Sequence, residues 1–228
     1  MTDLLPPKTK VVILEGNIGV GKSSVLRGLQ AKYNDTFEIF PEPRDLWRNF
    51  DGKNYLQASY EAKEGKYNVE KFQILVIFSL LERAINILKE AAQKNRIIII
   101  ERSLWSAIHF IEVNQHFGVF DEEFAKLLKL LVSETATFLD NFFIPTYIFL
   151  KCSPPINYER VKKRGRPEEE KLELSYLERL NEAHEAQFQF CKNRNMQVTQ
   201  IDTTNMQPDL VLQTVVKAAK KKLISFQN

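Results

Sequence analysis

Cysteine and histidine are both scarce in this chain of 228 residues. Its two cysteines, Cys152 and Cys191, and its three histidines follow neither the spacing of a zinc site nor that of a disulfide framework. This scarcity excludes a disulfide-stapled secreted domain, and we expect a reducing, cytoplasmic compartment.

Long apolar runs are missing as well. The longest nearly apolar stretch, residues 74–81, holds eight residues and includes a serine, whereas a bilayer-spanning helix needs roughly 20. The ten residues before the first predicted strand contain two prolines and no arginine, which is unlike a signal or transit peptide. We therefore expect neither a membrane helix nor a targeting segment.

Neither sign of charge dominates. Lys and Arg number 32 against 29 Asp and Glu, a net charge of +3, which is too small a bias to predict a nucleic-acid or membrane partner. The 44% hydrophobic and 27% charged residues are ordinary for a globular protein, and the length suits one domain over residues 1–228. An anionic ligand would have to meet positive charge gathered locally.

Five short strand-like segments alternate with helix-compatible sequence, which predicts an α/β fold with a parallel sheet. The segments are residues 11–14, 37–40, 97–100, 147–150 and 198–201. Residues 97–100 and 147–150 are continuously apolar, which is typical of strands covered by helices on both faces, so we place them inside the sheet.

Two helix starts are marked by their capping residues. Asp121, with two glutamates after it, opens a helix that we expect to run to about Phe142, ahead of Pro145. Ser153 followed by Pro154 is an N-cap and first-turn pair, which predicts another helix straight after the fourth strand.

The first strand runs directly into a glycine-rich loop that matches the pattern G-x-x-x-x-G-K-[ST] and leads into a helix. Glycines let successive N–H groups face phosphates, Lys22 adds a point charge, and the Ser23 hydroxyl can bind Mg²⁺. The loop predicts a P-loop NTPase fold and a nucleoside triphosphate ligand, while the absence of N-K-x-D and D-x-x-G motifs disfavours a GTPase. The phosphate-binding residues are predicted to be Gly16, Asn17, Ile18, Gly19, Val20, Gly21, Lys22, Ser23 and Ser24.

Carboxylates follow two of the predicted strands. Glu101 comes after four isoleucines and is similar to a Walker B acid, which would make it a second Mg²⁺ residue beside Ser23; a plain helix N-terminal acid is the alternative. Arg102 adds a cation there, either for the reaction or for a structural ion pair. Glu42 stands between two prolines after the second strand, where it could take the proton of a hydroxyl acceptor.

Several separated motifs across residues 11–188 stand in one order: Glu15-Gly16-Asn17-Ile18-Gly19, Glu42-Pro43 with Trp47, Phe72-Gln73, Glu101-Arg102-Ser103, and Arg160, Arg164 and Arg166 with Glu168-Glu169. This order resembles the deoxynucleoside kinases, which include deoxycytidine, deoxyguanosine, mitochondrial-type thymidine and insect broad-specificity kinases. The resemblance implies a five-stranded parallel sheet, ATP as phosphoryl donor with Mg²⁺, a deoxynucleoside whose 5′-hydroxyl is the acceptor, and a homodimer through the helices that match residues 104–117 and 121–142.

The resemblance also assigns roles to single residues. Glu42 looks like the carboxylate that deprotonates the 5′-hydroxyl with Arg102 beside it, although Glu101 could be the proton acceptor instead. The other roles that it implies are a 3′-hydroxyl contact for Tyr60 and Glu169, base-flanking rings for Trp47 and Phe72, and a base-edge contact for Gln73.

The expected base is a pyrimidine. Gln73, Val76 and Leu80 share one helix face, where an amide can offer a donor and an acceptor to thymine or cytosine. Leu80 and Ala107 stand where deoxycytidine kinases look charged, so the pocket should be apolar and should admit thymidine as well as deoxycytidine.

Five cations fall within residues 160–166 and would form a basic lid over ATP, with Arg160, Arg164 and Arg166 on its phosphates. The alternative is a solvated helix C-terminus. Two other functions stay open: a thymidylate or nucleoside monophosphate kinase, although Pro41 occupies the place of its phosphate-binding arginine, and a non-catalytic nucleotide-binding subunit, although Lys22, Glu42 and Glu101 are all present.

Overall fold

A computed structural model describes residues 8–60, 66–91 and 96–224. The first seven residues, for which the sequence predicts no targeting segment, lie outside this range. The elements run in the order β1 (Thr9–Gly16), α1 (Lys22–Lys32), β2 (Phe37–Phe40), α2 (Arg44–Arg48), α3 (Tyr55–Tyr60), α4 (Lys66–Ala91), β3 (Ile97–Glu101), α5 (Ser106–His116), α6 (Glu122–Leu139), β4 (Phe143–Lys151), α7 (Pro154–Arg164), the 3₁₀ helix η2 (Pro167–Glu169), α8 (Leu174–Asn193), β5 (Val198–Asp202) and α9 (Pro208–Ile224).

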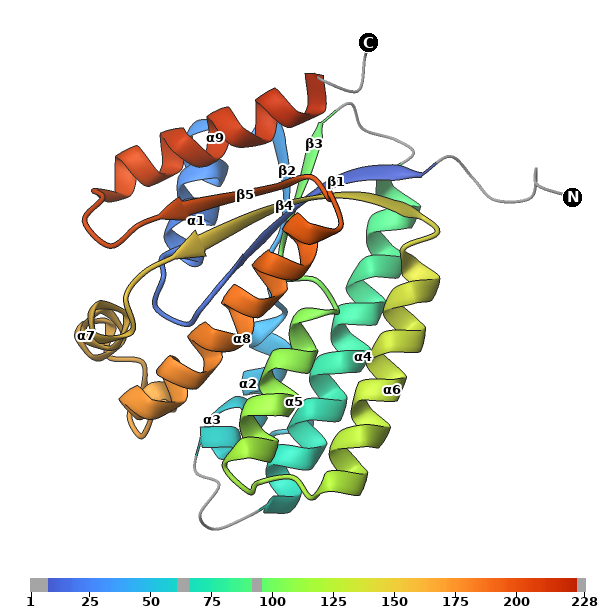
Figure 1. Cartoon of the computed structure of the whole chain (residues 1–228), viewed down its shortest axis with the longest axis vertical. Helices are drawn as coiled ribbons and strands as arrows, with labels where there is room; N and C mark the ends of the chain where they lie inside the picture. Colours follow the sequence, from blue (N-terminus) through green and yellow to red (C-terminus); the bar gives the residue numbers. More distant parts are fainter. Residues whose placement is uncertain (1–7, 61–65, 92–95, 225–228) are drawn as a thin grey trace, which may run out of the picture.

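The five strands form one sheet in the order β2-β3-β1-β4-β5, and every neighbouring pair is parallel (Figure 1). This arrangement confirms the predicted α/β fold with a five-stranded parallel sheet. It also confirms that β3 and β4 lie inside the sheet, on either side of β1. The carboxyl ends of β1, β2 and β3 therefore meet at one edge, which is where parallel sheets bind ligands.

Alternate side chains of β1 serve opposite faces of the sheet. Val12 and Leu14 pack with residues of α1 and α9, whereas Val11 and Ile13 pack with Ile87 of α4. Figure 1 shows α1 and α9 on one side of the sheet and α4, α5 and α8 on the other. Because both faces are covered, the middle residues of β1 and β3, Val11 to Leu14 and Ile98 to Ile100, are apolar and buried.

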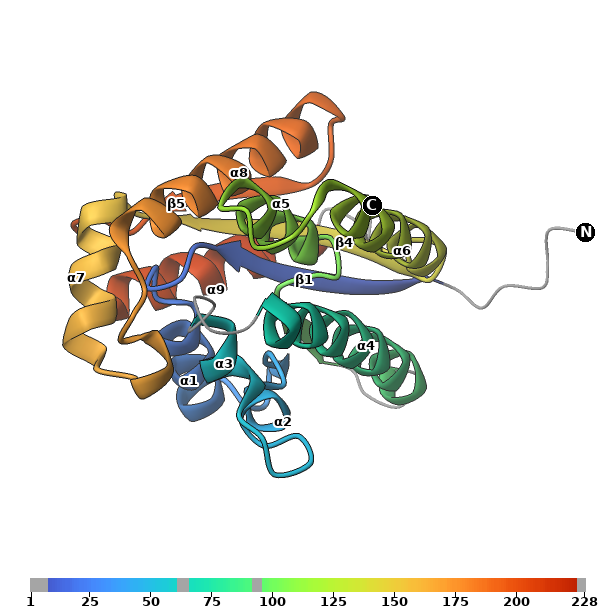
Figure 2. The same cartoon turned by 90° about the horizontal axis from the view of Figure 1, so that it is seen from below.

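A second core lies between helices rather than on the sheet. It joins α4, α5 and α6 through buried side chains that include Leu80, Ala107 and Val132. Figure 2 shows α7 on the opposite side of the molecule from α4 and α6, with the loop after β1 between them. The site described below is built from these two sides.

The helix predicted from Asp121 starts as expected and ends earlier. The Asp121 carboxylate accepts a hydrogen bond from the Phe124 N–H at 2.8 Å, but α6 stops at Leu139, so the predicted end near Phe142 is wrong. Pro145 lies inside β4. The N–H of Tyr147 donates toward the β5 side of the strand, and the backbone nitrogen of Pro145, two residues earlier, faces that same side. The pairing of β4 with β5 starts only at Tyr147, so the sheet loses no hydrogen bond through the missing proline N–H.

The other predicted helix start is correct in position only. Ser153 is the N-cap residue of α7, but its side chain makes no capping hydrogen bond. At the other end Gly165 caps α7 with φ +65°, in the left-handed region that glycine adopts easily. Among the described residues, no helix is long and apolar enough to cross a membrane.

Candidate active site

A cavity of about 890 Å³ opens at the carboxyl edge of the sheet. Its walls come from the loop after β1, the ends of β2 and β3, the helices α3, α4 and α5, and the segment around α7 and η2. Every residue that the sequence predicted for the site lines this cavity except Gly16 and Asn17. The structure therefore brings together predicted residues as far apart in the chain as Ile18 and Glu169.

The glycine-rich loop has a backbone that other residues could not adopt. Gly16 has φ +138°, and a side chain there would collide with the carbonyl oxygen of Leu150; Gly19 has φ +83°, and a Cβ would lie 2.7 Å from the carbonyl oxygen of Asn157. Gly21, the N-cap of α1, has no side chain to cap the helix, and the first turn contains no acid. The N-terminus of α1 thus faces the cavity with its dipole uncompensated, which suits an anion.

The loop holds Lys22, and Asn17 attaches the loop to α8. The Lys22 ammonium donates to the carbonyl oxygens of Gly16 at 2.8 Å and Asn17 at 2.9 Å. Burial, followed by repulsion from Arg102, lowers the pKa of Lys22 to about 7. The Asn17 side chain donates to the carbonyl of Leu177 in α8, so it braces the loop instead of lining the cavity.

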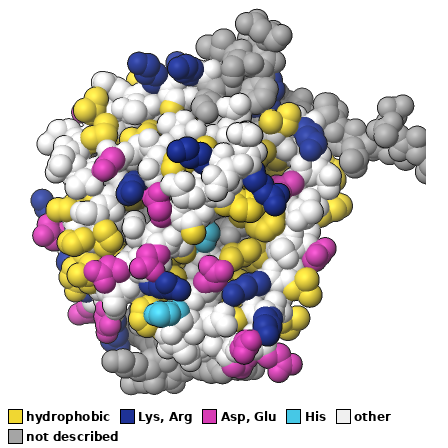
Figure 3. Space-filling model, viewed as in Figure 1, with side chains coloured by type: hydrophobic (Ala, Val, Ile, Leu, Met, Phe, Trp, Pro, Cys, Tyr) yellow, Lys and Arg dark blue, Asp and Glu magenta, His cyan; other side chains and the backbone are white. Residues whose placement is uncertain are grey.

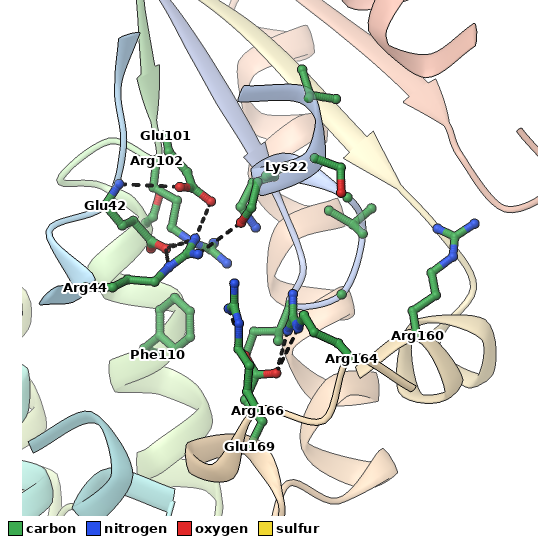
Figure 4. A pocket seen from close by; sticks show the side chains of 18 of the residues that line it. Lys22, Glu42, Arg44, Glu101, Arg102, Phe110, Arg160, Arg164, Arg166 and Glu169 are labelled. Carbon is green, nitrogen blue, oxygen red and sulfur yellow. Dashed lines mark hydrogen bonds and ion pairs between the residues drawn. The ribbon is translucent and has the colours of Figure 1, made fainter. Parts of the chain in front are cut away.

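Three charged residues meet where β2 and β3 end (Figure 4). Glu42 lies 2.9 Å from the Nε of Arg102 and 2.9 Å from an Nη of Arg44. The Glu42–Arg102 contact is an ion pair without an aligned hydrogen bond, because the Arg102 Nε–H has no acceptor in line among the described residues. Burial acts to raise the pKa of Glu42, but the charges of Arg102, Arg44 and Lys22 outweigh it and lower the pKa to about 2. Glu42 is therefore a carboxylate at neutral pH.

Arg44 is a site residue that the sequence analysis did not assign. Its guanidinium donates to Glu101 at 2.5 Å and to the Ser23 hydroxyl at 2.9 Å, besides its contacts with Glu42. Its place two residues after Glu42 was the signal that could have found it, because the end of β2 faces the crevice.

Two further residues hold the strand ends in place and were also missed. Glu15 is fully buried at the end of β1 and accepts hydrogen bonds from the N–H and hydroxyl of Ser103 and from the Ser106 hydroxyl. Arg83 of α4 donates to the carbonyl oxygens of Pro41, Glu101 and Arg102, at 2.9, 2.8 and 2.6 Å. These hydrogen bonds fix the ends of β2 and β3 relative to each other, and so they hold the backbone at Glu42 and Glu101 in place.

The other end of the cavity is aromatic and apolar. Trp47 and Phe72 meet edge to face at 5.7 Å, and the Trp47 indole donates to the Ser79 hydroxyl. Gln73 is buried with Val76 and Leu80 on the same side of α4, and its amide donates to the Ala107 carbonyl at 3.4 Å. The sequence analysis did not single out Ser106, Phe110, Asn114 and Tyr176, which also line this end.

The predicted sugar residues lie where the basic segment meets the apolar end. Tyr60 contacts Tyr176 edge to face at 6.4 Å, and burial, Tyr176 and Glu169 raise the pKa of Tyr60 well above its ordinary value. The Glu169 carboxylate accepts from Arg164 at 2.5 Å and from Arg166 at 3.3 Å. Both arginines therefore point into the cavity together with Glu169 (Figure 4).

Arg160 differs from the other two lid arginines. Its guanidinium donates to the carbonyl oxygens of Thr203 at 2.8 Å and Thr204 at 3.1 Å, and it lies apart from Arg164 and Arg166 in Figure 4. It lines the cavity, but its hydrogen bonds attach α7 to the loop after β5. A contact between Arg160 and a nucleotide stays a prediction.

Comparison with known proteins gives a consistent result. The family model described as deoxynucleoside kinase matches residues 12–225. Thymidine kinase of Ictalurid herpesvirus 1 is 32% identical over 182 residues, which cover 79% of this chain and 75% of that protein. Deoxycytidine kinase 2 of Gallus gallus is 28% identical over 203 residues, with coverages of 78% and 73%, and mitochondrial thymidine kinase 2 of Homo sapiens is 28% identical over 179 residues, with coverages of 78% and 64%. With its P-loop, its five-stranded parallel sheet and this match over most of its length, the chain belongs to the deoxynucleoside kinase family and is a phosphotransferase.

Proposed function

We propose that this kinase transfers the γ-phosphate of ATP to the 5′-hydroxyl of a pyrimidine deoxynucleoside, thymidine or deoxycytidine, in nucleotide salvage. One observation carries the proposal: the ionised carboxylate of Glu42 lies in a single cavity between the phosphate loop and the pocket of Trp47, Phe72 and Gln73. An acceptor hydroxyl that enters from the aromatic end would meet this carboxylate before the phosphate loop.

The chemistry follows from that placement. The 5′-oxygen bonds to the γ-phosphorus while the bond from that phosphorus to the β,γ-bridging oxygen breaks, and the hydroxyl proton goes to Glu42. The products are ADP and the deoxynucleoside monophosphate. Arg102 beside Glu42, and Arg164 and Arg166 from the lid, supply positive charge around the transferred group.

Ser23 and Glu101 fit a Mg²⁺ site. Both residues line the cavity, and in this structure both accept hydrogen bonds from the Arg44 guanidinium. Hydroxyl and carboxylate oxygens are the ligands that Mg²⁺ takes beside phosphates. When bound, Mg²⁺ would neutralise charge on the β- and γ-phosphates.

The pocket supports the pyrimidine preference. Gln73 is the polar side chain on an apolar wall made by Val76, Leu80 and Ala107, and its position is set by the Ala107 carbonyl. The wall has no charged group at positions 80 and 107, so it leaves an apolar surface for the methyl group of thymine. A thymidine kinase and a deoxycytidine kinase are both among the relatives.

We also propose a homodimer, through a surface that differs in part from the predicted one. Helix α5, which the sequence analysis included, is covered by α6 and α8, whereas α4 and α6 expose large apolar side chains. The proposed interface therefore uses α4 and α6. The preferred base and the cytoplasmic location stay predictions from the sequence.

The test is an assay of the purified chain with MgATP and each of the four deoxynucleosides, with dTMP as a further acceptor. We expect the highest rates with thymidine and deoxycytidine. The variant Glu42→Gln keeps the size of the side chain and should fold normally, but its turnover should fall by ~10² or more because the proton acceptor is lost. Asp45→Asn removes an exposed carboxylate three positions away and should be as active as the wild type.

Two results would contradict the proposed reaction. Transfer to dTMP without transfer to any deoxynucleoside would identify a monophosphate kinase. A folded Glu42→Gln variant with undiminished turnover on thymidine would assign the proton to another acceptor, such as Glu101.

A further inference from the structure

Arg44 brings a buried positive charge into the phosphate end of the cavity. The residue opens α2, directly after the loop that carries Glu42, and its side chain is only 19% exposed. Figure 4 shows its guanidinium extending toward the same space as Lys22, Glu42 and Glu101. It also lines the cavity, so a ligand bound there can touch it.

The contacts of Arg44 come from three different parts of the site. Its Nε and Nη2 groups donate to Glu42, Nη2 also donates to Glu101, and Nη1 donates to the hydroxyl of Ser23. Opposite charges explain the bonds to the two carboxylates. The Ser23 hydroxyl is neutral, so its hydrogen bond adds little to these ion pairs. The bond does show that the guanidinium lies against the phosphate loop.

That position is one where phosphate oxygens are expected. In a P-loop the hydroxyl after the lysine faces the β- and γ-phosphates and their metal ion. A guanidinium 2.9 Å from this hydroxyl lies beside the place of the same groups. Arginine has five N–H donors, and the bonds above leave one Nη1 hydrogen without an acceptor among the described residues.

We propose, on the basis of the function proposed above, that Arg44 is a further catalytic residue, whose guanidinium contacts a γ-phosphate oxygen of ATP and stabilises its charge during transfer. The site then has a cation of the protein itself beside Ser23 and Glu101, next to the proposed Mg²⁺ site. In the absence of any divalent metal ion, the wild type should therefore bind ATP more tightly than a variant without the Arg44 guanidinium. The contact also draws the guanidinium from Glu42, which frees that carboxylate to take a proton.

Nucleotide binding tests the contact without any acceptor. We would measure the affinities of AMP, ADP and ATP by titration calorimetry in EDTA and in Mg²⁺, for the wild type, Arg44→Gln and Arg44→Lys. Arg44→Gln should weaken metal-free ATP binding roughly ten-fold or more, with little effect on AMP, because the lost charged hydrogen bond is to the γ-phosphate. Arg44→Lys should recover part of the loss.

Turnover supplies the second readout. Removal of a donor that acts on transition-state charge typically costs on the order of 10² in kcat, so Arg44→Gln should lower kcat by about that factor and leave the KM of the deoxynucleoside unchanged. Arg179→Gln, which removes an exposed arginine that pairs with Glu182, is the matched control and should change neither readout.

Three outcomes would overturn the inference. Equal losses for AMP, ADP and ATP would mean that Arg44 supports the loop in general. If Arg44→Lys and Arg44→Gln both bind metal-free ATP as tightly as the wild type, Arg44 is only an ion-pair partner of Glu42 and Glu101. If either variant binds ATP more tightly or turns over faster, Arg44 hinders nucleotide binding. If Arg44→Gln does not fold, Arg44→Lys alone decides through the same series. Failure of the wild type to phosphorylate deoxynucleosides would refute the proposed function, while the binding series would still judge Arg44.

Discussion

Arg102 reaches Glu42 because its backbone is held in a conformation that an arginine seldom adopts. Its φ is +62°, a strain of about 1 kcal/mol or more that persists only where surrounding contacts impose it. Its N–H donates to the Leu14 carbonyl, and its own carbonyl accepts from Arg83. The side chain then lies over the Phe110 ring at 4.9 Å, so the guanidinium is aimed before any ligand arrives.

A pair of buried histidines lies behind Arg102. His184 Nε2 is 3.1 Å from a guanidinium nitrogen of Arg102, and the rings of His184 and His109 are 4.8 Å apart. Burial lowers the pKa of His109, and burial together with His109 and Arg102 lowers that of His184 well below its ordinary value. Both rings are therefore neutral at pH 7, and His184 can accept a hydrogen bond from Arg102.

This pair predicts a loss of stability in mild acid. Below the ordinary histidine pKa of 6.5 the unfolded chain takes up protons that the folded chain does not, so the free energy of unfolding falls as pH falls. The slope should approach about 1.4 kcal/mol per pH unit for each histidine. Urea denaturation at several pH values between 7.5 and 5.5 measures it.

Variants separate this effect from the rest of the chain. The double variant His109→Gln/His184→Gln should have a flatter dependence of unfolding free energy on pH than the wild type. His116→Gln removes an exposed histidine and should leave the slope unchanged. If the double variant and the wild type share one slope, the buried pair is not the cause.

The sequence predicts a site residue more readily than it predicts what holds that residue. Glu42 and Glu101 stand at strand ends, and Lys22 belongs to a local motif, so their positions made them candidates and the family resemblance added to the case. Glu15, Arg83 and His184 act through partners 18 or more positions away, and no local pattern distinguishes such a residue from any other buried polar group.

At the scale of the element, strands were easier to predict than helix ends. The three inner strands contain continuous apolar runs at residues 11–14, 97–100 and 147–150, and a parallel sheet with two covered faces requires such runs. The end of α6 was wrong because the prediction took Pro145 for the stop signal, whereas the proline is tolerated inside β4 beside an unpaired edge. The proline is tolerated because β5 begins to pair with β4 only at Tyr147, and the sequence alone does not show where β5 lies.

The two predicted N-caps should differ in energy. Asp121 accepts a hydrogen bond from the third helical N–H of α6, so Asp121→Ala should lower the free energy of unfolding by about 1 kcal/mol. Ser153 makes no such bond in α7, so Ser153→Ala should cost less than about 0.5 kcal/mol. Urea unfolding of both variants under identical conditions gives the comparison. Equal losses would mean that the Asp121 bond contributes nothing to the stability of α6.

At the scale of the whole molecule, charge is divided between the surface and the cavity. The net charge is only +3, and the face in Figure 3 mixes acidic and basic side chains with apolar ones. The cavity is not balanced in this way, because its lining holds eight cationic side chains and three carboxylates. The cations are Lys22, Arg27, Arg44, Arg102, Arg160, Lys163, Arg164 and Arg166, and the carboxylates are Glu42, Glu101 and Glu169. Phosphate groups that enter would compete with these carboxylates for the cations, and this competition could not be read from the net charge.

Apolar exposure is concentrated on two neighbouring helices. Phe78 of α4 is 58% exposed, Phe138 of α6 is 61% exposed, and most other large apolar side chains that the described residues expose belong to these helices: Ile74, Ile85, Leu127, Leu130 and Leu131. Each set follows helical spacing, so it forms one face of its helix. A contiguous apolar surface of this kind on a globular protein indicates a protein interface.

We therefore predict that the chain is a dimer that single charges on this surface can dissociate. Phe78→Glu and Phe138→Glu would each bury a carboxylate without a partner at the interface, so both variants should shift toward the 26.6 kDa monomer. Leu210→Glu places the same charge on an exposed position of α9, at 51% exposure, and should stay dimeric. Light scattering after size-exclusion chromatography, with all chains at one concentration, measures the mass. A monomeric wild type would refute the dimer, and dimeric variants with charges at 78 and 138 would place the interface elsewhere.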